Sequence, residues 1–212
     1  MDDPRYAESV DFLKSVGPDW ARLIERVGPC RHDPKAAREP YEALVRSIAY
    51  QQLTARAGDA IIGRLKTRLG GHGFPSPKQL ADADPDALRA CGFSAAKAAT
   101  IQAIAGAALS GFVPGRDAAA AMEDEALIDR LTAIRGIGRW TVEMLLIYSL
   151  ERLDVLPADD FGAREGYRLL KALPAPPTPR ALRGIASAWA PHRTVATWYL
   201  WRIPRDRAPA GT

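Results

Sequence analysis

Cysteine is nearly absent from this sequence: Cys30 and Cys91 are the only two among its 212 residues. Two cysteines cannot build a network of disulfide bonds, nor supply the four thiolates that an iron–sulfur cluster or a structural zinc site usually needs. We therefore expect both to be small buried side chains in a reduced protein. The sequence predicts no iron–sulfur cluster, no transition-metal site and no required cofactor.

Long apolar runs are missing as well. No stretch approaches the ~20 apolar residues that a membrane-spanning helix needs. The first residues, MDDPRYAESV, lack the basic and apolar regions of a signal peptide. These absences predict a soluble, cytoplasmic protein without a membrane partner, and a monomer is the default expectation.

The sequence has only a weak excess of one charge. Lysine and arginine number 29 against 25 acidic residues, which gives a net charge of +4 and a pI near 9.2. Such an excess permits a polyanionic partner but does not require one. On charge alone, an ordinary basic surface is the favoured explanation.

No alternating apolar and polar run is long enough to predict a β-strand, and apolar residues recur at helical spacing along nearly the whole chain. Proline, hydroxyl or acidic residues stand just before many of these segments, as they do at helix starts. Pro40 opens one such helix, and Ser94 precedes another. The sequence therefore predicts an all-α fold, with a single domain over residues 1–203 and a disordered tail over residues 204–212.

Two glycines interrupt the helical pattern in LTAIRGIGRWT. Gly136 and Gly138 flank Ile137 in a predicted hairpin of about residues 131–142, whose second helix begins near Arg139. Glycine adopts positive φ and permits close approach, and the free N–H groups at a helix N-terminus bind anions. A plain helix–helix turn would explain the glycines alone. The apolar spacing on both sides favours a phosphate-binding hairpin.

This segment resembles the helix-hairpin-helix of the base-excision DNA glycosylases, and LPADDFG resembles the loop that carries their catalytic aspartate. Three further segments, YEALVRSIAYQQLTARAG, LRACGFSAAKAATIQAIA and WAPHRTVATWYLW, resemble the 3-methyladenine DNA glycosylase II branch of AlkA-like enzymes. The resemblance extends over residues 38–203. It implies two α-helical lobes around a DNA-binding cleft, with damaged double-stranded DNA as the partner.

The same resemblance implies a catalytic function for Asp160, the second acid of DDFG. Breaking an N-glycosidic bond passes through an oxocarbenium-like state, which a carboxylate stabilises while it orients or deprotonates water. Asp159 is the rival by proximity, and either acid could simply cap the following helix. The match to the family pattern favours Asp160 as the catalytic residue and leaves the cap to Asp159.

Trp140 follows GIGR at the position where bifunctional relatives carry a lysine that forms a Schiff base. Tryptophan cannot be an amine nucleophile, so the resemblance predicts an enzyme without AP lyase activity. The indole face would stack on a cationic alkylated base, although a core position is the alternative. Tyr50, Phe161 and Met144 are weaker candidates for the base pocket.

A flipped nucleotide leaves a hole in the duplex that the protein must fill. Gln51, Gln52 and Leu53 resemble the family's plug, with Leu53 as the apolar wedge. A polar helix end followed by a core leucine explains these three residues equally well. The hairpin contributes the other predicted DNA contacts: Gly136, Ile137, Gly138, Arg139 and Thr141. For Arg139, a surface salt bridge is as plausible as a phosphate contact.

The segment WAPHRTVATWYLWRI is expected mainly to pack against the core. Its aromatic residues fall largely on one face: Trp189, Trp198, Tyr199 and Trp201. Arg193 could still reach the DNA cleft, and His192 is expected at the surface rather than as a base.

Members of the family often hold a structural monovalent cation at the hairpin through main-chain oxygens. By position, these would belong to Thr132, Ile134 and Ile137. Arg135 stands where many members have proline, and it could add a phosphate contact or disturb the cation site.

These features predict a monofunctional DNA glycosylase that flips and excises alkylated bases such as 3-methyladenine and 7-methylguanine, and so initiates base excision repair. A cationic base is a good leaving group, so one aspartate and an aromatic pocket suffice. Two alternatives stay open: a glycosylase for hypoxanthine, uracil or etheno adducts, and a non-catalytic DNA-binding module. Binding to DNA would place the protein with the nucleoid in the cytoplasm.

Overall fold

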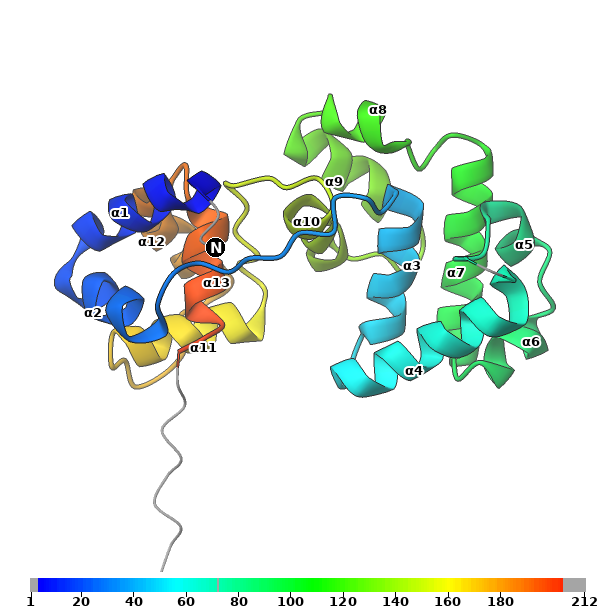
Figure 1. The fold of residues 1–212 in the computed structure, drawn as a ribbon, viewed down its shortest axis with the longest axis horizontal. Helices are drawn as coiled ribbons and strands as arrows, with labels where there is room; N and C mark the ends of the chain where they lie inside the picture. Colours follow the sequence, from blue (N-terminus) through cyan, green and yellow to red (C-terminus); the bar gives the residue numbers. More distant parts are fainter. Residues whose placement is uncertain (1–3, 72, 204–212) are drawn as a thin grey trace, which may run out of the picture. The chain divides into compact units, whose positions relative to one another are not determined.

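The computed structural model describes residues 4–71 and 73–203, and the regular elements within these residues are all helices (Figure 1). The predicted all-α class is therefore confirmed. The tail predicted to be disordered, residues 204–212, lies outside the described residues.

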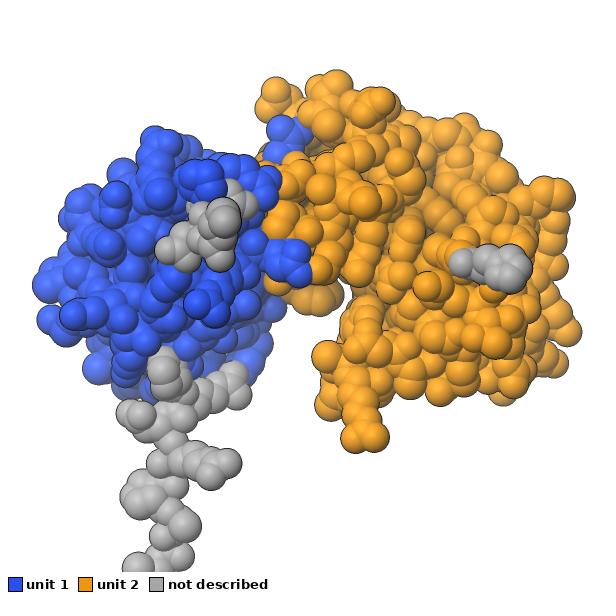
Figure 2. All heavy atoms as spheres, in the orientation of Figure 1, with its two compact units in different colours: residues 1–33, 152–212 blue, residues 34–151 orange. Residues whose placement is uncertain are grey.

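The chain divides into two compact units (Figure 2). Unit 1 comprises residues 1–33 and 152–212, and unit 2 comprises residues 34–151, so unit 2 is inserted into unit 1. The two ends of the insert are tied together, because the Lys35 N–H donates to the Tyr148 carbonyl oxygen at 2.6 Å. Two helical units agree with the two lobes that the resemblance implies.

Unit 1 is built from both ends of the chain. Its helices are η1 (Pro4–Tyr6), α1 (Ala7–Val16), α2 (Pro18–Val27), α11 (Phe161–Leu170), α12 (Pro179–Ile185), η3 (Ala186–Trp189) and α13 (Arg193–Leu200). Proline opens both α2 and α12, where its missing N–H costs nothing. The Thr178 hydroxyl caps α12 by accepting from the Ala181 N–H.

The core of unit 1 surrounds α13, whose residues Thr194–Leu200 are all buried. Helices α1, α2 and α11 pack against it, as Figure 1 shows. The rings of Trp20 and Trp189 meet edge to face with centroids 5.2 Å apart, which is a favoured aromatic geometry. The aromatic residues Trp189, Trp198 and Tyr199 are buried, so their predicted packing function is confirmed.

Helix α11 approaches α13 most closely at Gly166. A Cβ at this position would lie 2.2 Å from the Leu200 carbonyl oxygen and 2.7 Å from the Leu200 carbonyl carbon. Both atoms belong to a backbone that cannot move independently of α13. The absence of a side chain at Gly166 therefore sets the spacing of the two helices.

Unit 2 contains the middle of the chain. Its helices are α3 (Pro40–Tyr50), α4 (Ala55–Leu65), the π-helical turn η2 (Lys66–Gly70), α5 (Pro77–Ala81), α6 (Pro85–Ala90), α7 (Ala95–Leu109), α8 (Arg116–Ala120), α9 (Asp124–Thr132) and α10 (Arg139–Tyr148). The predicted starts at Pro40 and after Ser94 are confirmed. Helices α5 and α8 were not predicted, because segments this short contain little more than one helical repeat.

Helix α7 packs against α3, α5 and α6 in unit 2 (Figure 1). Ile101 and Ile104 are fully buried, and so are the small side chains of Ala98 and Ala105. Helix α10 packs against α3 and α9, and its residues Thr141–Ile147 are all buried. These two helices position the segments described next.

We expect Gly166→Ala to destabilise the protein by about 1–3 kcal/mol, because the new methyl group must push α11 away from α13. Gly184→Ala is the matched control in α12, since its Cβ position meets nothing within 4 Å beyond its chain neighbours and the backbone of its own helix. The free energy of unfolding of the control should equal that of wild type or exceed it by up to about 1 kcal/mol, because alanine favours the helix. Thermal and chemical denaturation measure both, and equal stability of the two variants would contradict the close approach.

Candidate functional site

The predicted hairpin forms between α9 and α10 in unit 2. Gly136 has a φ of +92°, and a Cβ there would lie 2.2 Å from the Thr100 Oγ1 of α7. Ile137 is buried and donates its N–H to the Ile134 carbonyl oxygen at 3.0 Å. Gly138 has an extended backbone that any residue adopts. The positive φ and the close approach thus explain Gly136 but not Gly138.

Helix α10 begins at Arg139, as predicted, and Gly138 precedes it without a capping side chain. The first N–H groups of a helix have no partner inside it, and the helix dipole makes this end positive. Apart from Gly138 itself and its two chain neighbours, no described residue comes within 4 Å of a Cβ placed there, so the approach to this end is open at that point. The N-terminus of α10 therefore has the properties expected of a phosphate contact.

The Arg139 guanidinium binds two carboxylates of its own unit. Its Nη1 donates to Glu125 Oε2 at 2.8 Å and its Nε to Glu143 Oε1 at 2.9 Å. Hydrogen bonding to Glu125, and then to Glu143, raises the pKa of Arg139 despite partial burial. Of the two explanations left open by the sequence, the structure supports the salt bridge.

Trp140 is half-buried on the first turn of α10, and Met144 follows it one turn later on the same face. Met144 itself is buried, with 9% of its surface exposed. Thr141 is buried, its hydroxyl accepts from Gln51 Nε2 at 3.4 Å, and its N–H donates to Gly138 O. The structure thus makes Thr141 an internal support, while the contacts of Trp140 and Met144 with a base stay predictions.

The Gln51–Thr54 turn joins α3 to α4. Gln52 has a φ of +59°, Leu53 is 43% exposed, and Thr54 caps α4 by accepting from the Ala57 N–H. The alternative of a core leucine at this position is therefore wrong. An exposed leucine on a tight turn has the form that an intercalating wedge needs.

Tyr50 is engaged at the corner between α3 and α4. Its hydroxyl hydrogen-bonds the Asp59 carboxylate, and its ring covers Gly58, where a Cβ would lie 2.2 Å from Tyr50 Cδ1. Burial, followed by the hydrogen bond to Asp59, raises the pKa of Tyr50. The structure gives Tyr50 a packing function here, and its predicted contact with a base stays a prediction.

Asp160 is the N-cap of α11 in unit 1. Its Oδ1 accepts from the Ala163 N–H at 2.7 Å and from the Trp201 indole Nε1–H at 2.8 Å. Two donors on one carboxylate oxygen fix the orientation of the whole group. Gly162 leaves room for this arrangement, because a Cβ there would lie 3.0 Å from both Asp160 Oδ1 and Trp201 Cδ1.

The predicted assignment of the helix cap to Asp159 is wrong, because the capping oxygen belongs to Asp160. Asp159 is exposed and accepts from Arg183 Nη2 at 2.9 Å. Phe161, the first residue of α11, is 60% exposed. An exposed aromatic side chain next to Asp160 is available for contact, but its function in a base pocket stays a prediction.

Trp201 is the site residue that sequence reasoning missed. Its position just after α13 suggested another packing residue, yet its indole N–H reaches a carboxylate 41 positions earlier in the chain. No local spacing encodes a contact over that separation. The pairing follows from the packing of α11 on α13.

Two expectations for the last segment are corrected by the structure. His192 is buried rather than at the surface: its Nδ1 lies 2.9 Å from Ser9 Oγ, and its ring packs 4.7 Å from that of Phe12. The Arg193 guanidinium forms a bidentate ion pair with Asp154, at 2.7 and 2.8 Å. Both side chains therefore stabilise unit 1.

The residues predicted to hold a monovalent cation lie in the segment between α9 and α10. The Ile134 carbonyl oxygen already accepts from the Ile137 N–H, and Thr132 ends α9. Arg135 is exposed. Across residues 4–71 and 73–203, no group of three or more His, Cys, Asp and Glu side chains could hold a metal ion.

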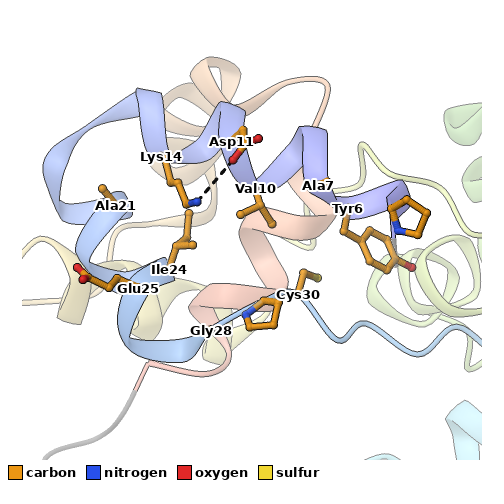
Figure 3. Close-up of a pocket in the computed structure, with 12 residues that line it drawn as sticks. Tyr6, Ala7, Val10, Asp11, Lys14, Ala21, Ile24, Glu25, Gly28 and Cys30 are labelled. Atoms are coloured by element: carbon orange, nitrogen blue, oxygen red, sulfur yellow. Dashed lines mark hydrogen bonds and ion pairs between the residues drawn. The ribbon is translucent and has the colours of Figure 1, made fainter. Parts of the chain in front are cut away.

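Unit 1 also has an open pocket of about 760 Å³ that is lined by η1, α1, α2 and the loop after α2 (Figure 3). Its lining is mainly apolar and includes Val10, Ile24 and Cys30. The charged residues of the lining are Asp11, Lys14 and Glu25, and the first two pair with each other at 3.5 Å. Ligand sites usually combine an apolar wall with convergent polar groups, and none of the predicted site residues lies here, so we assign it no function.

Most of the chain matches one known protein family. Residues 45–192 match the family described as "HhH-GPD superfamily base excision DNA repair protein". The chain belongs to this superfamily. Among curated HhH-GPD relatives, "DNA-3-methyladenine glycosylase 1" of Schizosaccharomyces pombe is 46% identical over 194 residues, covering 91% of this chain and 85% of the relative. The same yeast's "Alkylbase DNA glycosidase-like protein mag2" is 35% identical, covering 96% of both chains.

Solved structures of HhH-GPD proteins have a similar fold. A 3-methyladenine DNA glycosylase of S. pombe in complex with abasic DNA superposes with a TM-score of 0.85 at 45% identity, covering 92% of this chain and 96% of the other. A DNA-3-methyladenine glycosidase from Bacillus halodurans superposes with a TM-score of 0.80 at 34% identity, covering 95% of this chain and 89% of the other.

No helix within residues 4–71 and 73–203 is both long and apolar enough to cross a membrane.

The observed cap predicts how substitutions of Asp160 affect stability. Asp160→Ala should cost about 1–3 kcal/mol, because both the Ala163 N–H and the Trp201 indole N–H lose their acceptor. Asp160→Asn should cost much less, since the asparagine side-chain oxygen can accept both hydrogen bonds. Urea denaturation measures both variants, and equal losses would contradict the capping geometry.

Proposed function

We propose that this protein is a monofunctional DNA glycosylase that flips alkylated bases such as 3-methyladenine and 7-methylguanine out of duplex DNA and hydrolyses their N-glycosidic bond. The observation that carries the proposal is the fixed carboxylate of Asp160, which two donors orient on the DDFG loop. Support also comes from relatives named as 3-methyladenine DNA glycosylases, one of which is 46% identical. Cytoplasmic, nucleoid-associated repair by a monomer is part of the proposal.

The reaction separates the base from the sugar in a dissociative step. The C1′–N bond breaks, its electron pair leaves with the base, and a cationic base becomes neutral. The positive charge moves to the sugar, where the Asp160 carboxylate stabilises it. Water then adds its oxygen to C1′ and gives its proton to Asp160 or to solvent, which yields the free base and an abasic site.

Other proposed functions follow from the positions of single residues. Trp140 stacks its indole face on the electron-poor base, which favours alkylated over normal bases. Leu53 fills the gap that the flipped nucleotide leaves. The N–H groups at the start of α10 bind a backbone phosphate. An amine is absent at position 140, so the abasic strand is released uncut.

Asp160→Asn is the test of the catalytic carboxylate. We expect it to slow release of 3-methyladenine from methylated duplex DNA on the order of 10²–10⁴-fold, because the amide carries no charge and accepts no proton. Asp159→Asn is the control and should stay close to wild type, since it loses only an exposed ion pair to Arg183. Freed bases are identified by chromatography.

Three outcomes would contradict parts of this proposal. Full release by Asp160→Asn would remove the carboxylate from the mechanism. Release of hypoxanthine, uracil or etheno adducts without release of alkylated bases would change the substrate. Binding of DNA without release of any of these bases would make the protein a non-catalytic module.

Strand cleavage separates a monofunctional enzyme from a lyase. A 5′-labelled duplex with one alkylated base should stay at full length after reaction with wild type and be cut only by later hot alkali. Borohydride added during the reaction should trap no protein–DNA adduct, because no Schiff base forms. A trapped adduct would show that another amine of the chain attacks the sugar.

A further inference from the structure

The Gln51–Thr54 turn is held in an unfavourable conformation. Gln52 has a φ of +59°, although it is not glycine, and such a residue costs roughly 1–2 kcal/mol there. The next residue, Leu53, exposes 43% of its surface to water. Neither property helps the folded protein, so other contacts must stabilise this turn.

Lys97 of α7 makes such contacts. Its Nζ donates to the Gln51 carbonyl oxygen at 2.7 Å and lies 3.4 Å from the Ala49 carbonyl oxygen. Both carbonyls belong to the C-terminal end of α3, where the helix dipole is negative and favours a cation. The Lys97 ammonium group is partly removed from water where it binds the turn, and this burial lowers its pKa.

The same face of α7 also contacts the hairpin. Thr100 lies three residues after Lys97, so both side chains lie on one side of the helix. Thr100 packs against Gly136 so closely that a Cβ on Gly136 would lie 2.2 Å from its Oγ1. A second link joins the two loops directly, because Gln51 Nε2 donates to Thr141 Oγ1 at 3.4 Å.

We infer that Lys97 is a positioning residue for the contact with DNA. It holds the Gln51–Leu53 turn in the conformation that exposes Leu53 and keeps this turn at a set position relative to the hairpin. This inference rests on the proposed function, because it assumes that Leu53 enters the duplex. Lys97 acts through the two carbonyls of α3, not through a phosphate. Its companion in this arrangement is Thr100, which sets the distance of the hairpin from the same helix face.

Lys97→Met removes the ammonium group and keeps most of the aliphatic stem, whereas Lys97→Arg keeps a charged donor. The readout is single-turnover release of the same alkylated base from duplex and from single-stranded DNA. We expect Lys97→Met to slow release from duplex roughly tenfold, as for the loss of one charge-assisted hydrogen bond, and to leave single-stranded DNA unaffected. Lys97→Arg should restore most of the rate.

A Gln52→Gly substitution tests whether Lys97 acts by stabilising the positive φ of residue 52. Since glycine adopts positive φ without cost, Lys97→Met should slow duplex release less in a Gln52→Gly background than in wild type. Equal slowing on duplex and single-stranded DNA would overturn the inference. So would a drop of about one in the slope of log affinity against log salt for Lys97→Met, which would make Lys97 a phosphate contact.

Hydrogen exchange without DNA separates this inference from the proposed function. The Leu53 N–H donates to the Tyr50 carbonyl oxygen at 3.1 Å and should exchange faster in Lys97→Met, with less change in the Gln52→Gly background. Unchanged exchange in Lys97→Met would overturn the inference whatever the activity. Faster exchange in a protein that releases no base from any DNA would overturn the proposed function and leave support of the turn by Lys97 standing.

Discussion

The contact between Gly136 and Thr100 is the constraint on which the candidate site of unit 2 depends. Because a Cβ at Gly136 would lie 2.2 Å from Thr100 Oγ1, only glycine lets the hairpin approach α7. The positive φ at the same residue turns the chain, Ile137 becomes buried, and α10 begins at Arg139. The open N-terminus of α10 and the position of Trp140 on its first turn both follow from that start.

Several polar side chains that sequence patterns assign to DNA are used inside the protein. Arg139 binds Glu125 and Glu143, and the Thr141 hydroxyl accepts from Gln51. Such side chains hold backbone segments in place, which leaves main-chain N–H groups and Leu53 as the proposed contacts with DNA. Binding through a fixed main chain carries no sequence information, which suits an enzyme that must search any sequence for damage.

The helix cap formed by Asp160 is compatible with the catalytic role proposed for the same carboxylate. The residue before a helix is a favourable place for a carboxylate, because it caps a free N–H and faces the positive end of the dipole. Here Oδ1 accepts from both the Ala163 N–H and the Trp201 indole, so stability and orientation come from the same oxygen. Capping and catalysis, which looked like competing explanations, are compatible at this position.

The sequence by itself determined the helical class, the main helix starts and the hairpin, because caps, prolines and apolar spacing act over a few neighbouring residues. Starts such as Pro40 and Arg139 are examples. The tertiary structure alone decided which aspartate caps α11, that Trp201 holds it, and that Lys97 supports the Gln51–Leu53 turn. The contacts made by Trp201 and Lys97 join residues 41 and 46 positions apart, and only the packing of whole helices brings such residues together.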